Sequence, residues 1–201
     1  MNPLQQVGGP VPEAWMAAWE KQVLFWINGH HDPFFDPVMA FVSLVGEWGA
    51  CWIALLLSLL IWGKPEHKSV AVWLGLTMLI TSLCVVVPLR LLFPRDRPYE
   101  VLPEIRQMGL ALSGSSFPSG HVQSAWLAAV ALGGRWRGYA VPLTVFALLV
   151  SYSRLYSGMH YPLDIVAGCA IGVTAGVTML HLRAWRRRAK QQLIPARAVP
   201  E

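Results

Sequence analysis

The sequence predicts an all-α, polytopic membrane protein built as a bundle of transmembrane helices. Only 13% of its 201 residues are charged and 55% are hydrophobic, whereas a soluble domain carries about 25% charged residues. The apolar residues also form uncharged runs, and Ser69–Leu89 has about the length of roughly 20 residues that a helix needs to cross a bilayer. We therefore expect a single membrane domain over residues 1–201, with flexible tails at 1–12 and 190–201.

Two short helices are predicted before the first clear crossing. Residues 13–29 mix apolar positions with Glu20 and Lys21, a pattern typical of an amphipathic helix at the membrane surface or of an additional, poor crossing. A second short helix, at about 35–45, precedes a break at Gly46–Gly49. The sequence leaves open whether residues 13–29 cross the membrane.

Five clear crossings follow, and the loops between them orient the chain. The crossings are predicted at about 48–63, 67–92, 119–134, 138–157 and 161–183. Short basic segments lie at Gly63–Lys68, at Gly133–Gly138 and, after the last crossing, at Arg183–Lys190. Because successive crossings alternate in direction, all three segments share one side of the membrane, which the positive-inside rule makes cytoplasmic.

The basic run at Arg183–Lys190 has two interpretations. Such runs can bind nucleic acid, but a position directly after a membrane span favours contact with anionic lipid. We therefore expect the bilayer and a membrane lipid as partners, and no nucleic acid. The predicted location is a bacterial inner membrane, and the sequence gives no information on the oligomeric state.

Three polar motifs lie on the other, extracytoplasmic side. They are Arg90 followed by Arg97-Pro98, then Pro118-Ser119-Gly120-His121, and finally Ser153-Arg154 with His160 and Asp164. Basic residues on this side contradict the positive-inside rule, so their charge needs another explanation. A bound anion supplies one.

Each motif also has a structural interpretation. Arg90 and Arg97 could be interfacial anchors with snorkelling side chains, and His121 could be a polar helix start. Arg154 and Asp164 could form a structural ion pair. These interpretations do not explain why all of the motifs share one side, and ionisable groups beside membrane spans are functional candidates.

The motifs together suit a phosphate group. The guanidinium groups of Arg90, Arg97 and Arg154 can donate paired hydrogen bonds to phosphate oxygens and stay charged. Ser119 and Gly120 begin a helix, and the free N–H groups at a helix start attract an anion. These five residues are the predicted phosphate-binding residues.

The two histidines are the predicted catalytic groups. His160 and Asp164 are four positions apart at the start of a helix, with Pro162 in its first turn, and lie on nearly one face if the helix begins by Tyr161. A carboxylate on one ring nitrogen fixes the tautomer and leaves the other nitrogen able to attack. His121 can protonate the leaving oxygen. No cluster of metal ligands is visible, so we expect neither a metal nor a cofactor.

In this order the motifs resemble the type 2 phosphatidic acid phosphatase (PAP2) superfamily, which also includes the vanadium haloperoxidases. The resemblance covers about residues 90–164, and the surrounding spans fit the membrane branch. It implies that His160 is the nucleophile supported by Asp164, that His121 is the general acid, and that Arg90, Arg97, Ser119, Gly120 and Arg154 bind phosphate. One position departs from the family pattern, because Arg90 stands where lysine is usual, which keeps the charge but changes the geometry.

The predicted function is hydrolysis of a lipid phosphate or pyrophosphate by a membrane-embedded phosphatase, through a phosphohistidine intermediate. The lipid tail would enter sideways between helices. A site on the outer face favours undecaprenyl diphosphate, and phosphatidylglycerol phosphate and phosphatidate stay open because Tyr99–Phe117 cannot be decoded from one sequence.

Three other functions account for parts of this pattern. A lipid phosphotransferase would use the same residues, so the sequence does not separate it from a hydrolase. A haloperoxidase fits less well, since that branch is mostly soluble. A non-enzymatic anion transporter would explain the arginines but gives no reason for His121 or for the pairing of His160 with Asp164.

Overall fold

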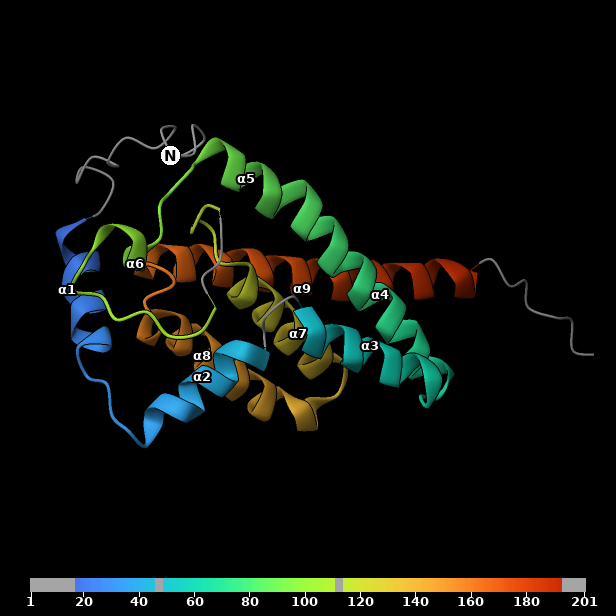
Figure 1. Cartoon of the computed structure of the whole chain (residues 1–201). Helices are drawn as coiled ribbons and strands as arrows, with labels where there is room; N and C mark the ends of the chain where they lie inside the picture. Colours follow the sequence, from blue (N-terminus) through green and yellow to red (C-terminus); the bar gives the residue numbers. More distant parts are fainter. Residues whose placement is uncertain (1–16, 46–48, 111–113, 193–201) are drawn as a thin grey trace, which may run out of the picture.

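The computed structural model describes residues 17–45, 49–110 and 114–192, and every regular element in these ranges is helical (Figure 1). The predicted all-α class is confirmed. Of the predicted tails, residues 1–12 and 193–201 lie outside the described ranges, whereas the last helix continues through Gln192.

The helices agree closely with the predicted segments. Their bounds are α1 (Ala18–Asn28), α2 (Phe35–Val45), α3 (Ala50–Ile61), α4 (Pro65–Thr81), η4 (Ser82–Val86), α5 (Val87–Leu92), α6 (Pro98–Val101), α7 (Gly120–Arg135), η5 (Arg137–Tyr139), α8 (Ala140–Tyr156) and α9 (Pro162–Gln192). The π-helical segment η4 joins α4 and α5 into one helix of 28 residues.

Among the described residues, three helices are long and apolar enough to cross a membrane: Pro65–Leu92, Arg137–Tyr156 and Pro162–Gln192. The pair α2 and α3 adds a fourth if it forms one span. Helix α7 has 16 residues, about 24 Å at 1.5 Å per residue, which is shorter than the roughly 30 Å hydrocarbon core. The membrane character is confirmed, and the number of five crossings stays a prediction.

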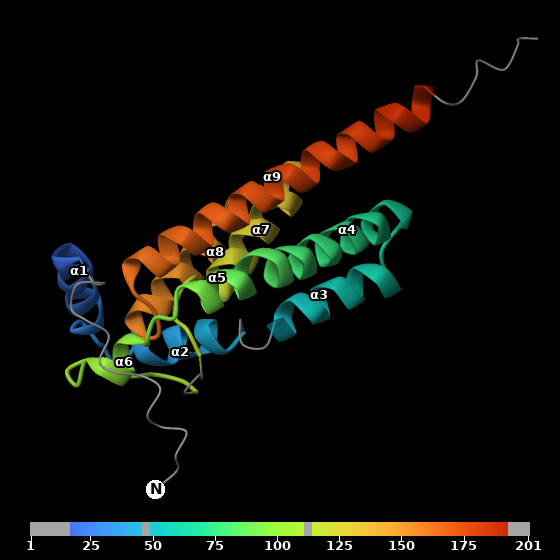
Figure 2. The same cartoon turned by 90° about the horizontal axis from the view of Figure 1, so that it is seen from above.

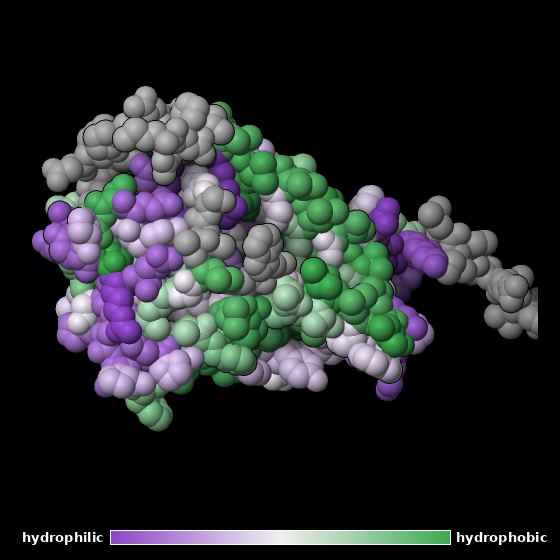
Figure 3. All heavy atoms as spheres, in the orientation of Figure 1, coloured by the Kyte–Doolittle hydropathy of each residue, from purple (hydrophilic) through white to green (hydrophobic). Residues whose placement is uncertain are grey.

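Large apolar side chains cover the outside of the bundle. Leu79 and Leu83 are 55% and 58% exposed, and Val141 is 73% exposed. Figure 3 shows a hydrophobic zone over α3 and α4 between hydrophilic surfaces at the two ends. A continuous apolar surface of this kind needs a lipid environment or a partner, in agreement with an integral membrane protein.

Helix α7 lies at the centre and packs against both α8 and α9. Its contact with α9 is a contact between backbones, because glycines recur on α9 at every fourth position. A methyl group at Gly172 would lie 2.3 Å from the carbonyl oxygen of Gln123, and one at Gly168 would lie 2.6 Å from that of Ser119. Small residues allow such close approach between membrane helices, and here they fix the start of α7 against the first turns of α9.

The polar motifs meet at one end of the bundle. Helix α5 and helix α8 end there, and α7 and α9 begin there (Figures 1 and 2). Helix α1 lies across this end and contacts α8 and α9. The predicted basic segments are at the opposite end, since they connect or follow the other termini of the same helices.

Candidate active site

The structure brings the predicted site residues together from elements that are far apart in sequence. Arg90 lies on α5, Arg97 caps α6, and Arg154 lies near the end of α8. Ser119, Gly120 and His121 form the start of α7. His160 lies in the turn before α9, and Asp164 lies in the first turn of α9. Except for Gly120 these residues carry polar side chains, and five of them are buried: Arg97, Ser119, Arg154, His160 and Asp164. Burying this many polar groups is costly unless they are paired or bind a ligand, so the cluster has the character of a binding site.

His160 and Asp164 form the predicted pair. Helix α9 begins at Pro162, so His160 precedes it and the pair does not share a helix face as the sequence analysis had considered. The turn nevertheless places His160 Nδ1 3.5 Å from Asp164 Oδ2. The same oxygen accepts a hydrogen bond of 2.8 Å from the backbone N–H of Tyr161, and both contacts hold the carboxylate beneath the ring.

The second ring nitrogen of His160 faces an arginine. Nη1 of Arg97 lies 3.4 Å from His160 Nε2 and donates a 3.1 Å hydrogen bond to the carbonyl oxygen of Met159. Burial lowers the pKa of His160 from 6.5 to about 4, although Asp164 opposes this shift. The ring is therefore neutral at pH 7, and the tautomer with its proton on Nδ1 leaves a lone pair on Nε2.

The start of α7 forms a second wall. The helix begins at Gly120, as predicted, and the side chain of Ser119 makes no capping hydrogen bond. Arg90 Nη2 lies beside the first residue of α7, 3.4 Å from the carbonyl oxygen of Pro118. A methyl group at Gly120 would lie 3.1 Å from this Nη2 atom. Glycine thus leaves room for the guanidinium beside the first turn of α7, so that Arg90 and the unpaired N–H groups of that turn can donate to the same anion.

Several buried polar atoms in this cluster make no hydrogen bond within the described part of the chain. They include Arg90 Nε, Arg97 Nε, Ser119 Oγ and His121 Nε2, and also His160 Nδ1, whose 3.5 Å contact with Asp164 is an ion-pair contact. Buried polar atoms are nearly always satisfied in folded proteins. The positive charges of Arg90, Arg97 and Arg154 act on His121, so the region that these atoms surround favours an anion with several acceptor oxygens.

Arg154 is held by a residue that the sequence analysis did not single out. Its Nη1 donates a 2.6 Å hydrogen bond to Ser43 Oγ on α2. Both side chains are buried. The short helix α2 therefore helps to orient a predicted phosphate-binding arginine.

Sequence reasoning also missed an ionic network beside Asp164. Arg95 donates from Nη1 to Asp164 Oδ1 at 2.8 Å and from Nη2 to Glu20 Oε2 at 3.0 Å. Burial alone lowers the pKa of Arg95, but the two carboxylates outweigh it and raise the pKa above its ordinary value. A carboxylate in an amphipathic helix beside the membrane was the available signal for Glu20, and the basic stretch before Arg97 was the signal for Arg95.

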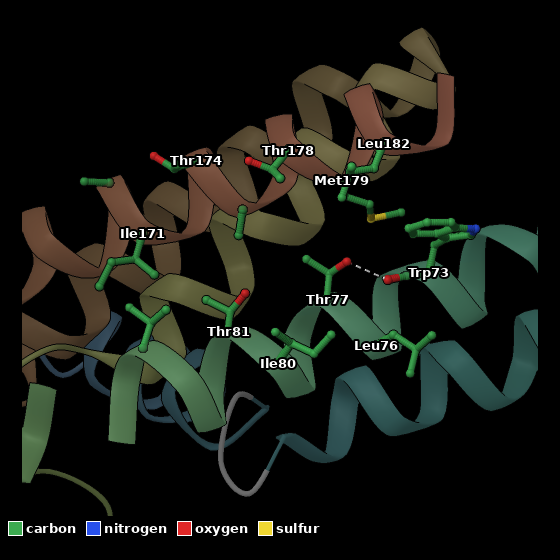
Figure 4. Close-up of a pocket in the computed structure, with 13 residues that line it drawn as sticks. Trp73, Leu76, Thr77, Ile80, Thr81, Ile171, Thr174, Thr178, Met179 and Leu182 are labelled. Atoms are coloured by element: carbon green, nitrogen blue, oxygen red, sulfur yellow. Dashed lines mark hydrogen bonds between the residues drawn. The ribbon is translucent and has the colours of Figure 1, made fainter. Parts of the chain in front are cut away.

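Two hollows lie along the bundle between the α4–α5 helix and α9. One of about 570 Å³ opens between α4 and α9 and is shown in Figure 4; its lining includes Trp73, Leu76, Ile80, Ile171 and Leu182. The hydroxyl of Thr77 there donates to the carbonyl oxygen of Trp73 at 2.7 Å, so it does not interrupt the apolar lining. A second, of about 280 Å³, lies closer to the polar cluster and is lined by Leu89, Phe93, Arg95, Phe117 and Leu163.

In residues 17–45, 49–110 and 114–192, no group of three or more His, Cys, Asp or Glu side chains is placed to hold a metal ion.

Comparison with known proteins places this geometry in a family. The model of the PAP2 superfamily matches residues 70–188. The chain is 28% identical over 148 residues to undecaprenyl-diphosphatase BcrC of Bacillus subtilis (strain 168), covering 73% of this chain and 74% of that protein. It is 32% identical over 168 residues to the lipid A 4'-phosphatase of Bacteroides thetaiotaomicron, covering 78% of this chain and 73% of that protein.

Solved structures give the same result. The crystal structure of Aquifex aeolicus LpxE superimposes with a TM-score of 0.74 at 28% identity, over 83% of this chain and 97% of that one. A transmembrane PAP2-type phosphatidylglycerolphosphate phosphatase from Bacillus subtilis shares the fold, with a TM-score of 0.63 at 17% identity over 89% of this chain and 88% of that one. The chain accordingly belongs to the PAP2 superfamily, in its branch of membrane lipid phosphatases.

Proposed function

We propose that this membrane lipid phosphatase transfers the terminal phosphate of its substrate to His160 and then to water. The observation that supports the proposal is a set of buried polar atoms, in the same cluster as the neutral ring of His160, that have no hydrogen-bond partner among the described residues: Arg90 Nε, Arg97 Nε, Ser119 Oγ and His121 Nε2. A phosphate group offers acceptor oxygens to all of them, and preorganised donors of this kind stabilise a phosphoryl group in transfer.

In the first step, Nε2 of His160 attacks the terminal phosphorus, and the bond from phosphorus to the lipid-side oxygen breaks as the P–N bond forms. Arg90, Arg97 and Arg154 bind the equatorial oxygens. His121 donates a proton to the departing oxygen. Asp164 stabilises the positive charge that develops on the ring of His160, as a carboxylate does for a histidine in other hydrolases.

In the second step, water hydrolyses the phosphohistidine. His121, which has given up its proton, accepts one from the attacking water as the P–O bond forms and the P–N bond breaks. Inorganic phosphate leaves, and both histidines return to their starting states. The pairing of His160 with Asp164 at 3.5 Å favours this chemistry over anion transport, which requires no paired nucleophile.

The lipid tail of the substrate has a place beside this site. The hollow lined by Leu89, Phe93 and Leu163 includes the side chain of Arg95, which reaches the catalytic pair. The larger hollow lies further along the same two helices (Figure 4). We propose that the chain of the lipid enters sideways from the bilayer and lies along these two hollows, since both are apolar and open toward the surface that lipid covers.

We propose undecaprenyl diphosphate as the substrate. Its support is the relatives that carry the name undecaprenyl-diphosphatase, in Bacillus subtilis and in Sulfolobus acidocaldarius, each 28% identical to this chain. The basic segments at the opposite end of the bundle support an orientation with the site on the extracytoplasmic face of a bacterial inner membrane. On that face the enzyme would hydrolyse undecaprenyl diphosphate in the outer leaflet of the membrane.

The test is release of inorganic phosphate by the purified protein in detergent from undecaprenyl diphosphate, phosphatidylglycerol phosphate and phosphatidate, with His160→Ala as the inactive control. The highest kcat/KM is expected for undecaprenyl diphosphate, with inhibition by orthovanadate and none by EDTA. A folded protein that releases phosphate from none of the three, and from lipid A neither, would overturn the proposed activity. A higher kcat/KM for another lipid would overturn the substrate alone, and phosphate appearing on an added lipid acceptor would identify a phosphotransferase.

A further inference from the structure

Helix α1 buries an acidic side chain at the site end of the bundle. Glu20 is 0% exposed, although α1 has only 11 residues and is otherwise amphipathic. Oε2 of Glu20 accepts a hydrogen bond from Arg95 Nη2 at 3.0 Å, and Oε1 accepts one from the backbone N–H of Leu163 at 3.1 Å. The N–H of Leu163 belongs to the first turn of α9, where helical N–H groups have no partner within the helix.

Arg95 connects this carboxylate to the predicted catalytic pair. Its second amino group, Nη1, donates to Asp164 Oδ1 at 2.8 Å, and the guanidinium lies 3.9 Å above the centre of the Tyr161 ring. The backbone of Arg95 is bonded to the loop before α7, through Ser115 Oγ at 3.1 Å and Ser116 N at 2.7 Å. Arg95 is therefore fixed relative to α1, α9 and the phosphate-binding loop at once.

We infer that Glu20 and Arg95 are positioning residues, through which α1 orients Asp164 and thereby His160. The inference rests on the proposed function of the site. Asp164 Oδ1 is occupied by Arg95, which turns Oδ2 toward Nδ1 of His160. Outer partners that fix a catalytic carboxylate in this way preserve the tautomer and orientation of the histidine. Anchoring at the membrane surface would not require a carboxylate at 0% exposure.

The charges of the network predict effects of opposite sign. The charged and titratable groups around the His160–Asp164 pair are Arg95, Arg97, Arg154, His121 and Tyr161, with Glu20 behind Arg95. Glu20→Gln leaves the positive charge of Arg95 less compensated, which lowers the pKa of His160. Arg95→Gln removes a positive charge that is directly bonded to Asp164, which raises the pKa of His160.

The experiment measures kcat, KM and the pH dependence of kcat/KM for phosphate release by the full-length protein in detergent. Glu20→Gln is expected to lower kcat roughly ten- to hundredfold, as removal of such supporting partners does elsewhere, with KM little changed. The acid limb of kcat/KM is expected to move to lower pH in Glu20→Gln and to higher pH in Arg95→Gln. Glu66→Gln is the matched control, because Glu66 pairs with Arg135 in an exposed ion pair of 2.5 Å at the opposite end.

Thermal unfolding and orthovanadate binding show whether each variant is folded with an intact phosphate pocket. A folded Glu20→Gln protein with parental kcat and an unmoved acid limb overturns the inference, as do shifts of the same sign in both variants. If Glu20→Gln does not fold, Glu20→Asp replaces it in the experiment. The retained charge should keep the acid limb of kcat/KM in place, and the shorter side chain should lower kcat. A parental kcat in Glu20→Asp would then overturn the inference. An inactive parent protein overturns the proposed function as well, whereas an active parent with unaffected variants overturns this inference alone.

Discussion

Asp164 lies 3.5 Å from Nδ1 of His160 through one carboxylate oxygen, while its other oxygen is bound by Arg95 at 2.8 Å. The two contacts assign different tasks to the two oxygens. One faces the ring that the proposed mechanism uses as nucleophile, and the other fixes the carboxylate to the rest of the protein.

Removing the proposed nucleophile tests the role of His160 directly. His160→Ala is expected to reduce phosphate release by several orders of magnitude, as loss of a nucleophile or its histidine does in other hydrolases. Asp164→Asn keeps the shape of the side chain but loses its charge, so it should reduce kcat strongly as well. Phosphate release from purified, folded protein measures both, and activity of His160→Ala within about tenfold of the parent would exclude it as nucleophile.

The pH dependence tests the state of the same ring. Burial lowers the pKa of His160 from 6.5 to about 4, so the ring loses its proton at a lower pH than ordinary imidazole does. The nucleophile is then competent above about pH 4, and kcat/KM, which reports ionisations of the free enzyme, should have its acid limb well below 6.5. Measurements of kcat and kcat/KM across the acidic pH range test this prediction. An acid limb of kcat/KM at or above pH 6.5, the ordinary pKa of histidine, would contradict it.

The two arginines of the first motif should differ in their tolerance of lysine. Arg97 Nη1 contacts the carbonyl oxygen of Met159 at 3.1 Å and Nε2 of His160 at 3.4 Å. Nε of the same planar guanidinium has no hydrogen-bond partner in the described part of the chain and is free to donate to a phosphate oxygen. A lysine ammonium has a single nitrogen and cannot make both sets of contacts. Arg90 has one weak contact, of 3.4 Å, with the carbonyl oxygen of Pro118. Arg97→Lys is therefore expected to lower kcat/KM more than Arg90→Lys, and equal losses or the reverse order would refute the assignment.

Alanine substitutions at two glycines of α9 should have similar effects on stability but different effects on activity. A methyl group at Gly168 would lie 2.6 Å from the carbonyl oxygen of Ser119, whereas one at Gly176 would lie 2.8 Å from Cβ of Val130. Both alanine variants overpack the interface with α7 and should lower stability by about 1–3 kcal/mol. Only Gly168→Ala displaces Ser119, one of the proposed phosphate-binding residues, so it alone should also lower kcat in protein that is still folded. Thermal unfolding and phosphate release, measured side by side, give the comparison, and equal activity of the two variants would count against it.

The orientation of the chain can be tested by labelling. Single cysteines at positions Gln107 and Gln191, in a background where Cys51, Cys84 and Cys169 are replaced, report on the two ends of the bundle. A membrane-impermeant thiol reagent applied to intact cells, with any outer membrane permeabilised, should label position 107 and spare position 191. The opposite pattern would invert the topology and would leave the proposed enzyme a phosphatase of the inner leaflet.

The sequence by itself determined the class of the protein and the identity of its polar motifs. Uncharged apolar runs, such as Ser69–Leu89, have the length that a bilayer imposes on a helix, so their positions could be read without the fold. The start of α7 at Gly120 was also predictable, because glycine and a preceding serine are local signals. The motif spacing was sufficient for the family resemblance, and the match of the family model to residues 70–188 confirms it.

Only the tertiary structure decided which residues surround the catalytic pair. Glu20 and Asp164 are separated by most of the chain, and neither periodicity nor local propensity relates them; they meet at Arg95 because α1 lies across the end of α9. The position of α7 relative to α9 could not be predicted from the sequence either, because nothing in the sequence shows which helix packs against the glycines of α9. The close approach of the α9 backbone at Gly172 to the carbonyl oxygen of Gln123 fixes that position. Contacts between distant elements depend on how the helices pack in three dimensions. The hydrophobic pattern of the sequence predicts where each helix lies in the chain, but not which helices pack against each other.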